Sequence, residues 1–149
     1  MSLYYKFMKI LLINGPNLNF LKKREKIYSN FSFKNIKKKI IFYSKNKLEI
    51  IFFNSNCEGK IINFIQKNLN IKFLLINPGA YSHNSIALLD CLKIYKGMLI
   101  EIHISNIYNR EYFRKNSLIS LRSNLIISGM GLNGYFHSID YIINYDYRN

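Results

Sequence analysis

Short apolar runs alternate along the chain with longer stretches in which apolar residues recur at helical spacing. The runs lie at 9–13, 48–53, 73–76, 98–102 and 125–128. Short, nearly continuous apolar runs are typical of parallel strands that are buried on both faces. We therefore expect five strands, each separated from the next by a helical or irregular segment.

The intervals between these runs carry helix signals. Ser32 can cap a helix in which Phe33, Ile36, Ile40 and Tyr43 share one face. Further helical segments are expected near 58–68, 85–94 and 110–114, and a last helix presents Tyr135, Ile139 and Ile142. Strands that alternate with helices predict an α/β protein with a flavodoxin-like, doubly wound, five-stranded parallel sheet and helices on both faces.

Three of the apolar runs end abruptly in polar residues. The clusters are Asn14-Gly15-Pro16-Asn17, Asn77-Pro78-Gly79-Ala80-Tyr81-Ser82-His83 and Glu101-Ile102-His103-Ile104-Ser105-Asn106. In open α/β sheets, ligands bind in the crevice beyond the carboxyl ends of the strands. The clusters therefore predict one assembled site, and this organisation is typical of a small enzyme.

Composition sets the broad class of the protein. A chain of 149 residues that is 49% hydrophobic is expected to form a single domain over 1–149, with 1–7 a dispensable extension. No apolar stretch approaches the roughly 18 residues of a membrane helix, and no signal-peptide pattern occurs, so we expect a cytoplasmic protein with no membrane partner. Cys57 and Cys91 are expected to be free thiols without a metal.

The formal charge of +14 has two interpretations. It can be the footprint of a nucleic-acid-binding protein, whose affinity would then fall steeply with salt. It can also follow from a composition rich in Lys, Asn, Ile, Tyr and Phe. The basic residues are spread along the chain, which favours the second interpretation and predicts no nucleic-acid partner. A positive field would still attract an anionic small substrate.

Two of the three histidines follow strand ends. His is the side chain best suited to proton transfer near neutral pH, which makes His83 and His103 candidates for catalysis. Glu101 precedes His103 by two residues, so both side chains project to the same side of an extended chain. The carboxylate could orient the imidazole or stabilise its charge, whereas a satisfied core histidine is the structural alternative.

The basic segment 20–31 is long enough to move as a lid over the active site. It contains Tyr28, and nearby cations favour the phenolate and lower a tyrosine pKa that starts near 10. Tyr28 is therefore a candidate general base, with Arg24 the obvious cation.

Two further segments are open to two interpretations each. Arg110 and Arg114 could clamp a carboxylate, or they could form a surface ion-pair helix with Glu111. The glycines of 129–134 match a dinucleotide fingerprint, but no strand follows them. We interpret them as close strand-to-helix packing, and keep a flavodoxin-like flavin or nucleotide binder as the alternative.

Taken together and in order, the motifs resemble type II 3-dehydroquinate dehydratase over residues 8–145. They are Asn14-Gly15-Pro16-Asn17-Leu18-Asn19, Arg24-Glu25 followed by Tyr28, Ser55-Asn56-Cys57-Glu58-Gly59, Asn77-Pro78-Gly79-Ala80-Tyr81-Ser82-His83, Glu101-Ile102-His103-Ile104-Ser105-Asn106, Arg110-Glu111-Tyr112-Phe113-Arg114 and Gly129-Met130-Gly131. This chain lacks the proline that usually follows Arg-Glu, and its lid is one residue shorter than is usual in the family.

The resemblance implies a hydro-lyase that needs neither metal nor cofactor. It would remove water from 3-dehydroquinate in an anti elimination through an enolate, giving 3-dehydroshikimate in the shikimate pathway to chorismate and aromatic amino acids. Tyr28 would accept the proton, and Arg24 would keep it ionised and stabilise the transition state. His103 would donate the proton with Glu101 behind it, and Asn17 would hold a water that stabilises the enolate.

The resemblance also implies how the substrate is bound and how the chains assemble. The substrate-binding residues would be Asn77, His83, Asp90, Ile104, Ser105 and Arg114. The protein would be a homododecamer, built as a tetramer of trimers, with each active site near a subunit boundary.

Overall fold

A five-stranded parallel sheet forms the centre of the protein. The computed structural model describes residues 8–24, 32–44 and 48–146. The strands are β1 (Met8–Asn14), β2 (Leu48–Asn54), β3 (Phe73–Asn77), β4 (Met98–His103) and β5 (Leu125–Ser128). They lie in the order β2-β1-β3-β4-β5, and every neighbouring pair is parallel. The predicted strands and the doubly wound, flavodoxin-like topology are confirmed.

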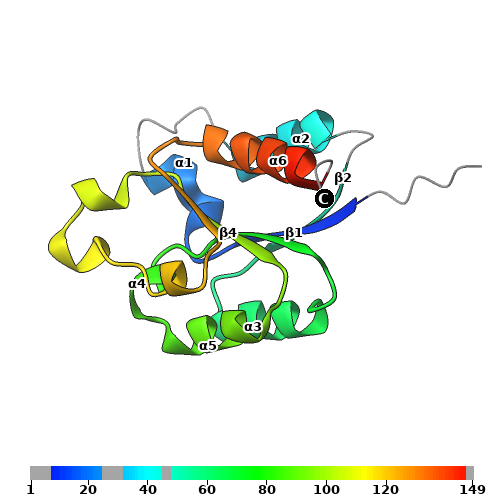
Figure 1. Cartoon of the computed structure of the whole chain (residues 1–149). Coiled ribbons are helices and arrows are strands. Elements are labelled where there is room, and N and C mark those ends of the chain that lie inside the picture. Colours follow the sequence, from blue (N-terminus) through cyan, green and yellow to red (C-terminus); the bar gives the residue numbers. More distant parts are fainter. Residues whose placement is uncertain (1–7, 25–31, 45–47, 147–149) are drawn as a thin grey trace, which may run out of the picture.

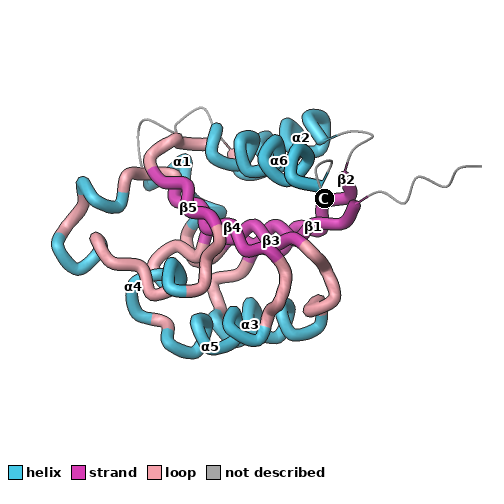
Figure 2. Tube along the Cα trace, viewed as in Figure 1, coloured by secondary structure: helices cyan, strands magenta, loops and turns pink. Residues whose placement is uncertain are grey.

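Helices cover both faces of this sheet. α2 (Phe33–Ser44) and α6 (Asn133–Asp146) pack on one face, and α3 (Glu58–Lys67) and α5 (Ile86–Ile94) pack on the other (Figures 1 and 2). The remaining helical segments are single turns: η1 (Leu18–Phe20), α1 (Leu21–Arg24), α4 (Tyr81–Asn84), η3 (Ile107–Asn109), η4 (Tyr112–Arg114) and η5 (Ile119–Leu121).

The alternation of side chains along β1 explains why positions 10–13 are all apolar. Ile10 and Leu12 face the core beneath α2 and α6, whereas Leu11 and Ile13 face the core beneath α3 and α5. All four are at most 1% exposed. Each fully buried aliphatic side chain contributes about 1.5–3 kcal/mol relative to an exposed one, so a strand between two helical layers gains on both faces.

Serine caps define where two of the helices begin. The Ser32 hydroxyl accepts a hydrogen bond from the Asn35 amide at 3.2 Å, which confirms the predicted cap of α2. The Ser85 hydroxyl accepts from the Leu88 amide at 2.9 Å at the start of α5. On α2 the predicted face is only partly buried, because Tyr43 is exposed and donates to Asp140.

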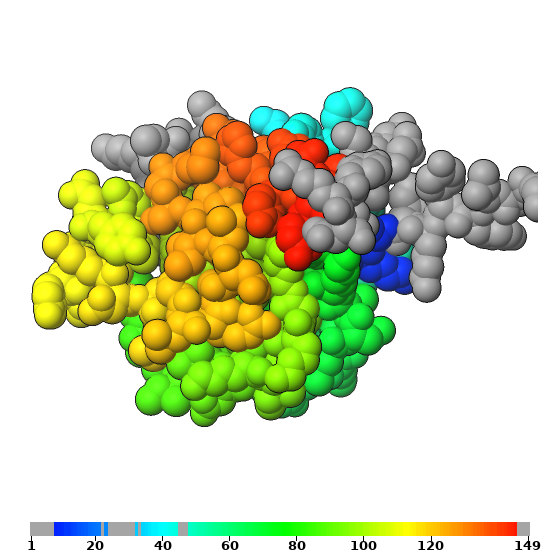
Figure 3. Space-filling model, in the orientation of Figure 1, coloured from blue at the N-terminus to red at the C-terminus, as the bar shows by residue number. Residues whose placement is uncertain are grey.

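The segment after β4 departs from the sequence expectation. The helical piece expected around 110–114 is instead two separate 3₁₀ turns, η3 and η4, and a further turn, η5, precedes β5. This segment projects from one end of the molecule, in yellow in Figures 1 and 3. Short 3₁₀ turns form without the apolar periodicity that marks a longer helix, so hydrophobic patterning does not reveal them.

Other expectations concern cysteines and membrane helices. Cys57 is exposed and Cys91 is buried, and both are free thiols, as predicted. Within residues 8–24, 32–44 and 48–146, none of the helices combines the length and the apolar composition that a bilayer crossing requires. The proposed extension 1–7, and residues 25–31 of the expected lid 20–31, lie outside the described residues.

Candidate active site

The polar ends of β1, β3 and β4 surround one cleft at the carboxyl edge of the sheet. Its volume is about 350 Å³. The predicted site residues that line it are Asn17, Asn77, His83, His103, Ile104, Ser105 and Arg114. Parallel strands bring their carboxyl ends to the same edge, so residues far apart in the sequence meet here.

The turn after β1 is fixed by close backbone contact with the turn after β3. The Gly15 amide donates to the Asn77 carbonyl at 2.8 Å, and a Cβ on Gly15 would collide with the Pro78 carbonyl oxygen. Asn17 then adopts the left-handed conformation with φ 65°, which asparagine tolerates better than most residues. The backbone N–H of Asn17 donates to Oδ1 of the Asn56 side chain at 2.9 Å. The backbone of Asn17 is therefore fixed at the cleft, which the residue lines.

A buried network holds the Asn77 side chain. Its Nδ2 donates to the Tyr135 hydroxyl at 3.2 Å, and its Oδ1 accepts from the Gly79 amide at 3.2 Å. The Tyr135 hydroxyl donates in turn to Oδ1 of Asn14 at 2.6 Å. Burial raises the pKa of Tyr135, so the phenol stays neutral and keeps its proton for this bond. An amide nitrogen carries two hydrogens, which leaves Asn77 a second N–H for a ligand.

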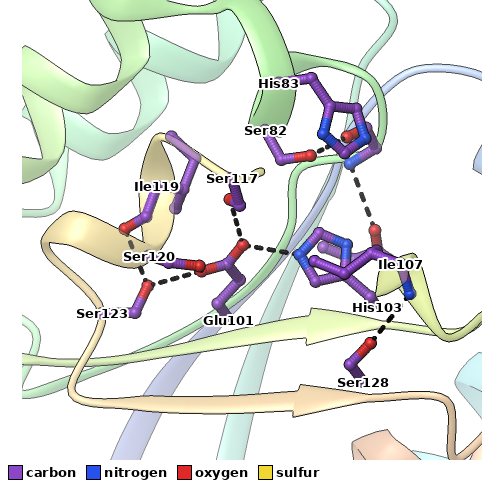
Figure 4. Close-up of polar contacts among 12 residues, drawn as sticks. Ser82, His83, Glu101, His103, Ile107, Ser117, Ile119, Ser120, Ser123 and Ser128 are labelled. Carbon is purple, nitrogen blue, oxygen red and sulfur yellow. Dashed lines mark hydrogen bonds and ion pairs between the residues drawn. The ribbon is translucent and has the colours of Figure 1, made fainter. Parts of the chain in front are cut away.

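His103 and Glu101 form a tight pair at the end of β4. His103 Nε2 lies 2.6 Å from Glu101 Oε1 (Figure 4). The two side chains are only 6% and 0% exposed, and they share a side of the strand as predicted. A carboxylate can only accept, so Nε2 carries the hydrogen. Nδ1 is therefore the ring nitrogen through which His103 can exchange a proton with a ligand.

Glu101 is ionised despite its burial. Burial alone would raise the pKa of this carboxyl group, because a low-dielectric interior disfavours charge. Hydrogen bonds from His103, Ser117 and Ser120 outweigh burial and hold the pKa below its ordinary value. At neutral pH the site therefore contains a permanent negative charge directly behind His103.

His83 lies across the cleft on α4 and has a different partner. Its Nδ1 lies 2.8 Å from the carbonyl oxygen of Asn116. A carbonyl only accepts, so Nδ1 carries the hydrogen and the neutral ring presents Nε2 as an acceptor.

The two arginines form the ion pairs with Glu111 that the sequence suggested, and both also lie at the cleft. Arg114 Nε and Arg110 Nε lie 3.5 Å and 3.8 Å from Oε2 of Glu111, so the ion pairs exist. Both arginines also line the cleft, and Arg110 Nη1 lies 3.5 Å from the Ser105 hydroxyl. A guanidinium can serve a carboxylate partner and still present further N–H groups to a ligand.

Comparisons with known proteins agree with this geometry. The family model of dehydroquinase class II matches residues 8–143. The chain belongs to this family. It is 49% identical over 138 residues to 3-dehydroquinate dehydratase of Clostridium botulinum (strain Hall), covering 91% of this chain and 94% of that protein.

Solved structures of the family share the fold. The type II dehydroquinase of Butyrivibrio crossotus DSM 2876 has a TM-score of 0.86 and 44% identity, covering 93% of this chain and 98% of that chain. The type II dehydroquinase of Propionibacterium acnes has a TM-score of 0.87 and 32% identity, covering 92% and 97%. The dehydroquinase fold therefore extends over nearly the whole of this chain.

Of the remaining predicted site residues, Glu101 lies behind His103 and does not itself line the cleft. Asp90 lies on α5, where its side chain is 65% exposed and 3.8 Å from Lys93. Arg24 ends α1, a turn whose Leu21 lines the cleft, but the Arg24 side chain lies outside the described residues. Tyr28 lies entirely outside them.

Sequence reasoning missed a group of hydroxyls around Glu101. Ser117, Ser120 and Ser123 all donate to its carboxylate. A signal was present, since the serines recur at the three-residue spacing that places side chains on one face of a 3₁₀ turn. Tyr135 was also expected only as a core residue, although its hydroxyl connects Asn14 to Asn77.

Two of the glycines of 129–134 serve close packing, whereas a Cβ on Gly131 would meet no atom within 4 Å. Gly129 has φ +83°, and a Cβ there would lie 3.1 Å from the Cβ of Asn106. A Cβ on Gly134 would lie 3.3 Å from methyl groups of Ile102 and Ile127. Among the described residues, no group of three or more His, Cys, Asp or Glu side chains is placed to hold a metal ion.

Proposed function

We propose that this chain dehydrates 3-dehydroquinate to 3-dehydroshikimate as a type II dehydroquinase, a hydro-lyase of the shikimate pathway to chorismate and aromatic amino acids. The observation that carries the proposal is the buried His103–Glu101 pair, 2.6 Å apart, at the wall of a cleft of about 350 Å³. A proton donor backed by a fixed carboxylate is what the expulsion of a hydroxyl group as water requires.

His103 supplies the acid step. The ionised Glu101 accepts the hydrogen of Nε2 and so fixes the ring with Nδ1 free to act on the substrate. Nδ1 donates its proton to the departing hydroxyl as the carbon–oxygen bond breaks, and the leaving group departs as water. The neutral imidazole that remains regains a proton from solvent before the next turnover.

Tyr28 and Arg24 supply the base step in this proposal. Tyr28, as the phenolate, takes the proton from the carbon next to the ketone, and the electron pair moves to the ketone oxygen as an enolate. As the hydroxyl leaves, the ketone re-forms and the electron pair makes the carbon–carbon double bond, and Tyr28 then returns its proton to solvent. Arg24 keeps the tyrosine ionised and stabilises the negative charge. Asn17, held at the cleft rim, positions a water against the enolate oxygen. The match of segment 8–143 to the family supports these assignments.

The remaining cleft residues fit a polyhydroxylated carboxylate. Ser105 and the backbone of Ile104 bind the anionic group, and Arg114 adds positive charge at the same wall. Asn77 and His83 provide a fixed donor and a fixed acceptor for ring hydroxyls. The formal charge of +14 favours the approach of such an anion.

The position of Asp90 supports an active site that is completed by another subunit. This carboxylate is exposed on α5 and does not line the cleft of its own chain, so contact with substrate requires the cleft of another subunit. We propose a cytoplasmic homododecamer, a tetramer of trimers, with no nucleic-acid or membrane partner. Light scattering should give a mass close to twelve 17.7 kDa chains, and a monomer with full activity would contradict the role of Asp90.

The function is tested by adding 3-dehydroquinate to the purified protein and following the ultraviolet absorbance of the conjugated enone. We expect turnover that persists after dialysis against a chelator, and we expect Tyr28→Phe to abolish it while the fold stays intact. A folded wild-type protein that gives no enone would contradict the proposed function, and a fully active Tyr28→Phe would contradict the assigned base.

A further inference from the structure

The Glu101 carboxylate accepts hydrogen bonds on both of its oxygens. Oε1 accepts from His103 Nε2 at 2.6 Å and from the Ser117 hydroxyl at 2.5 Å. Oε2 accepts from the Ser120 hydroxyl at 2.7 Å and from the Ser123 hydroxyl at 3.0 Å. In Figure 4 these four donors surround the carboxylate. A buried charge is very costly unless it is hydrogen-bonded, so this arrangement is what permits an ionised Glu101 at 0% exposure.

The serines are held in place by contacts that do not involve Glu101. The Leu118 amide donates to the Ser82 carbonyl at 2.7 Å. Arg122 Nη2 donates to the carbonyls of Tyr95 and Gly97 at 2.6 and 2.9 Å. These bonds tie the segment 117–123 to α4 and to the start of β4, so the hydroxyls are pre-positioned around the carboxylate.

The serine hydroxyls are neutral donors, so they stabilise the Glu101 carboxylate without neutralising it. A lysine or arginine would neutralise Glu101 and cancel its field at His103, whereas hydroxyl groups stabilise the carboxylate and leave its net charge unchanged. Among the described residues, the titratable group whose charge acts on Glu101 is His103 itself. The negative charge of Glu101 is therefore directed at the catalytic imidazole.

We propose that Ser117, Ser120 and Ser123 are positioning residues that keep Glu101 charged and fixed behind His103 for the proton-donating step. This inference rests on the proposed dehydratase function. The serines touch neither substrate nor reacting atoms in it, and they act through Glu101 alone.

The three hydroxyls differ in how strongly they stabilise the Glu101 carboxylate. Ser123 lies 3.0 Å from Glu101 Oε2 and also 3.0 Å from the Ile119 carbonyl, so one hydrogen is shared between two acceptors. Ser117 and Ser120 each give a short bond to the carboxylate, and both lower the pKa of Glu101. Ser120 and Ser117 therefore carry most of the effect, and Ser123 carries the least.

The experiment compares Ser120→Ala with Ser138→Ala as its matched control. Ser138 is fully buried, whereas Ser120 is partly buried, and the Ser138 hydroxyl donates to the Gly134 carbonyl within α6. We expect Ser120→Ala to lower kcat about tenfold with KM unchanged, as for the loss of one hydrogen bond to a charged group. Its acid limb of activity moves to higher pH, because the pKa of Glu101 rises. Ser120→Thr, which keeps the hydroxyl, restores kcat, and Ser138→Ala matches the wild type.

A double-mutant cycle with Glu101→Gln separates positioning from general destabilisation. If the serine acts through the carboxylate charge, Ser120→Ala causes no further loss of kcat once that charge is gone. The same tenfold loss in both backgrounds would overturn the inference, as would an unchanged kcat in Ser120→Ala. If Ser120→Ala does not fold, Ser117→Ala takes its place in the cycle under the same two criteria.

Acid unfolding tests the inference without substrate. Because the folded pKa of Glu101 is depressed, the stability it contributes is present above its ordinary pKa and is lost as pH falls. Circular dichroism should show Ser120→Ala unfolding at higher pH than Ser138→Ala. Coincident acid transitions would overturn the inference. If wild-type protein gives no enone, the proposed function fails, and this measurement still decides whether the serines stabilise the charge.

Discussion

The two histidines of the cleft are the same residue type at the same sheet edge, but they have different partners. His103 at the end of β4 is bound to an ionised carboxylate, whereas His83 on α4 is bound to a neutral backbone carbonyl. A negative partner stabilises the charged imidazolium, while a carbonyl only selects a tautomer. In the proposed mechanism, the partner behind the ring, and not the histidine itself, therefore assigns His103 to proton donation and His83 to binding.

Replacing His103 should have the largest effect. His103→Ala removes the general acid, and we expect kcat to fall by about 10²- to 10⁴-fold, the usual contribution of a positioned acid. KM should change little, because the binding residues stay in place. The enone assay measures the loss, and circular dichroism checks the fold. A His103→Ala variant with unchanged kcat would remove the basis of the comparison.

Replacing Glu101 with a neutral residue should leave His103 with an uncharged partner, as His83 has. Glu101→Gln keeps the shape and removes the charge, so we expect kcat to fall about ten- to a hundredfold while KM is retained. Steady-state kinetics at neutral pH measure this. Wild-type kcat in Glu101→Gln would show that the carboxylate charge has no role in proton donation.

Replacing His83 should affect binding. His83→Ala removes an acceptor from the cleft wall, and we expect KM to rise about tenfold with kcat nearly constant, which is the mark of lost uniform binding. His137→Ala, an exposed histidine on α6, serves as the control. A loss confined to kcat would show that His83 takes part in the reaction step, and it would contradict the proposal that His83 only binds substrate.

Replacing Tyr135 tests the network that holds Asn77, the other residue assigned to binding. Tyr135→Phe leaves the Asn14 and Asn77 side chains each short of one buried partner, and we expect a stability loss of about 1–3 kcal/mol with a severalfold rise in KM. Tyr141→Phe, half exposed on the same helix, is the control in urea unfolding. Equal stability of the two variants would contradict the network.

The smallest effect concerns acid stability. The pKa of Glu101 is lowered in the folded protein, so its stabilising contribution is present above the ordinary carboxyl pKa and disappears as pH falls through the folded value. Glu101→Gln lacks this contribution at every pH. We expect its unfolding free energy to depend less on pH in the acid range than that of the wild type. If the unfolding free energies of the wild type and Glu101→Gln depend on pH in the same way, Glu101 is not held in its charged form.

Local sequence pattern predicted the sheet because its cause is local. Positions 10–13 of β1 and 73–76 of β3 are all apolar, and burial on both faces requires that. The pairing of Glu101 with His103 was predictable for the same reason, since side-chain alternation along a strand is a property of the chain itself.

The hydroxyls around Glu101 depend on tertiary structure. Nothing in the neighbourhood of Ser117 or Ser120 indicates which acceptor they will meet, because β4 is brought to them only by the folding of the sheet. The role of Asp90 is also not predictable from local sequence. It lies away from the cleft of its own chain, so its proposed role depends on an assembly that one chain does not contain.

The central claim is that the His103 side donates a proton and that a separate base removes one. The direct measurement is nuclear magnetic resonance of 3-dehydroquinate incubated with His103→Ala in deuterated water. The account predicts that deuterium enters at the carbon next to the ketone while enone formation stays at least a hundredfold below that of the wild type, about the loss of a general acid. Enone formation at the wild-type rate would contradict the account, because another group would then protonate the leaving hydroxyl.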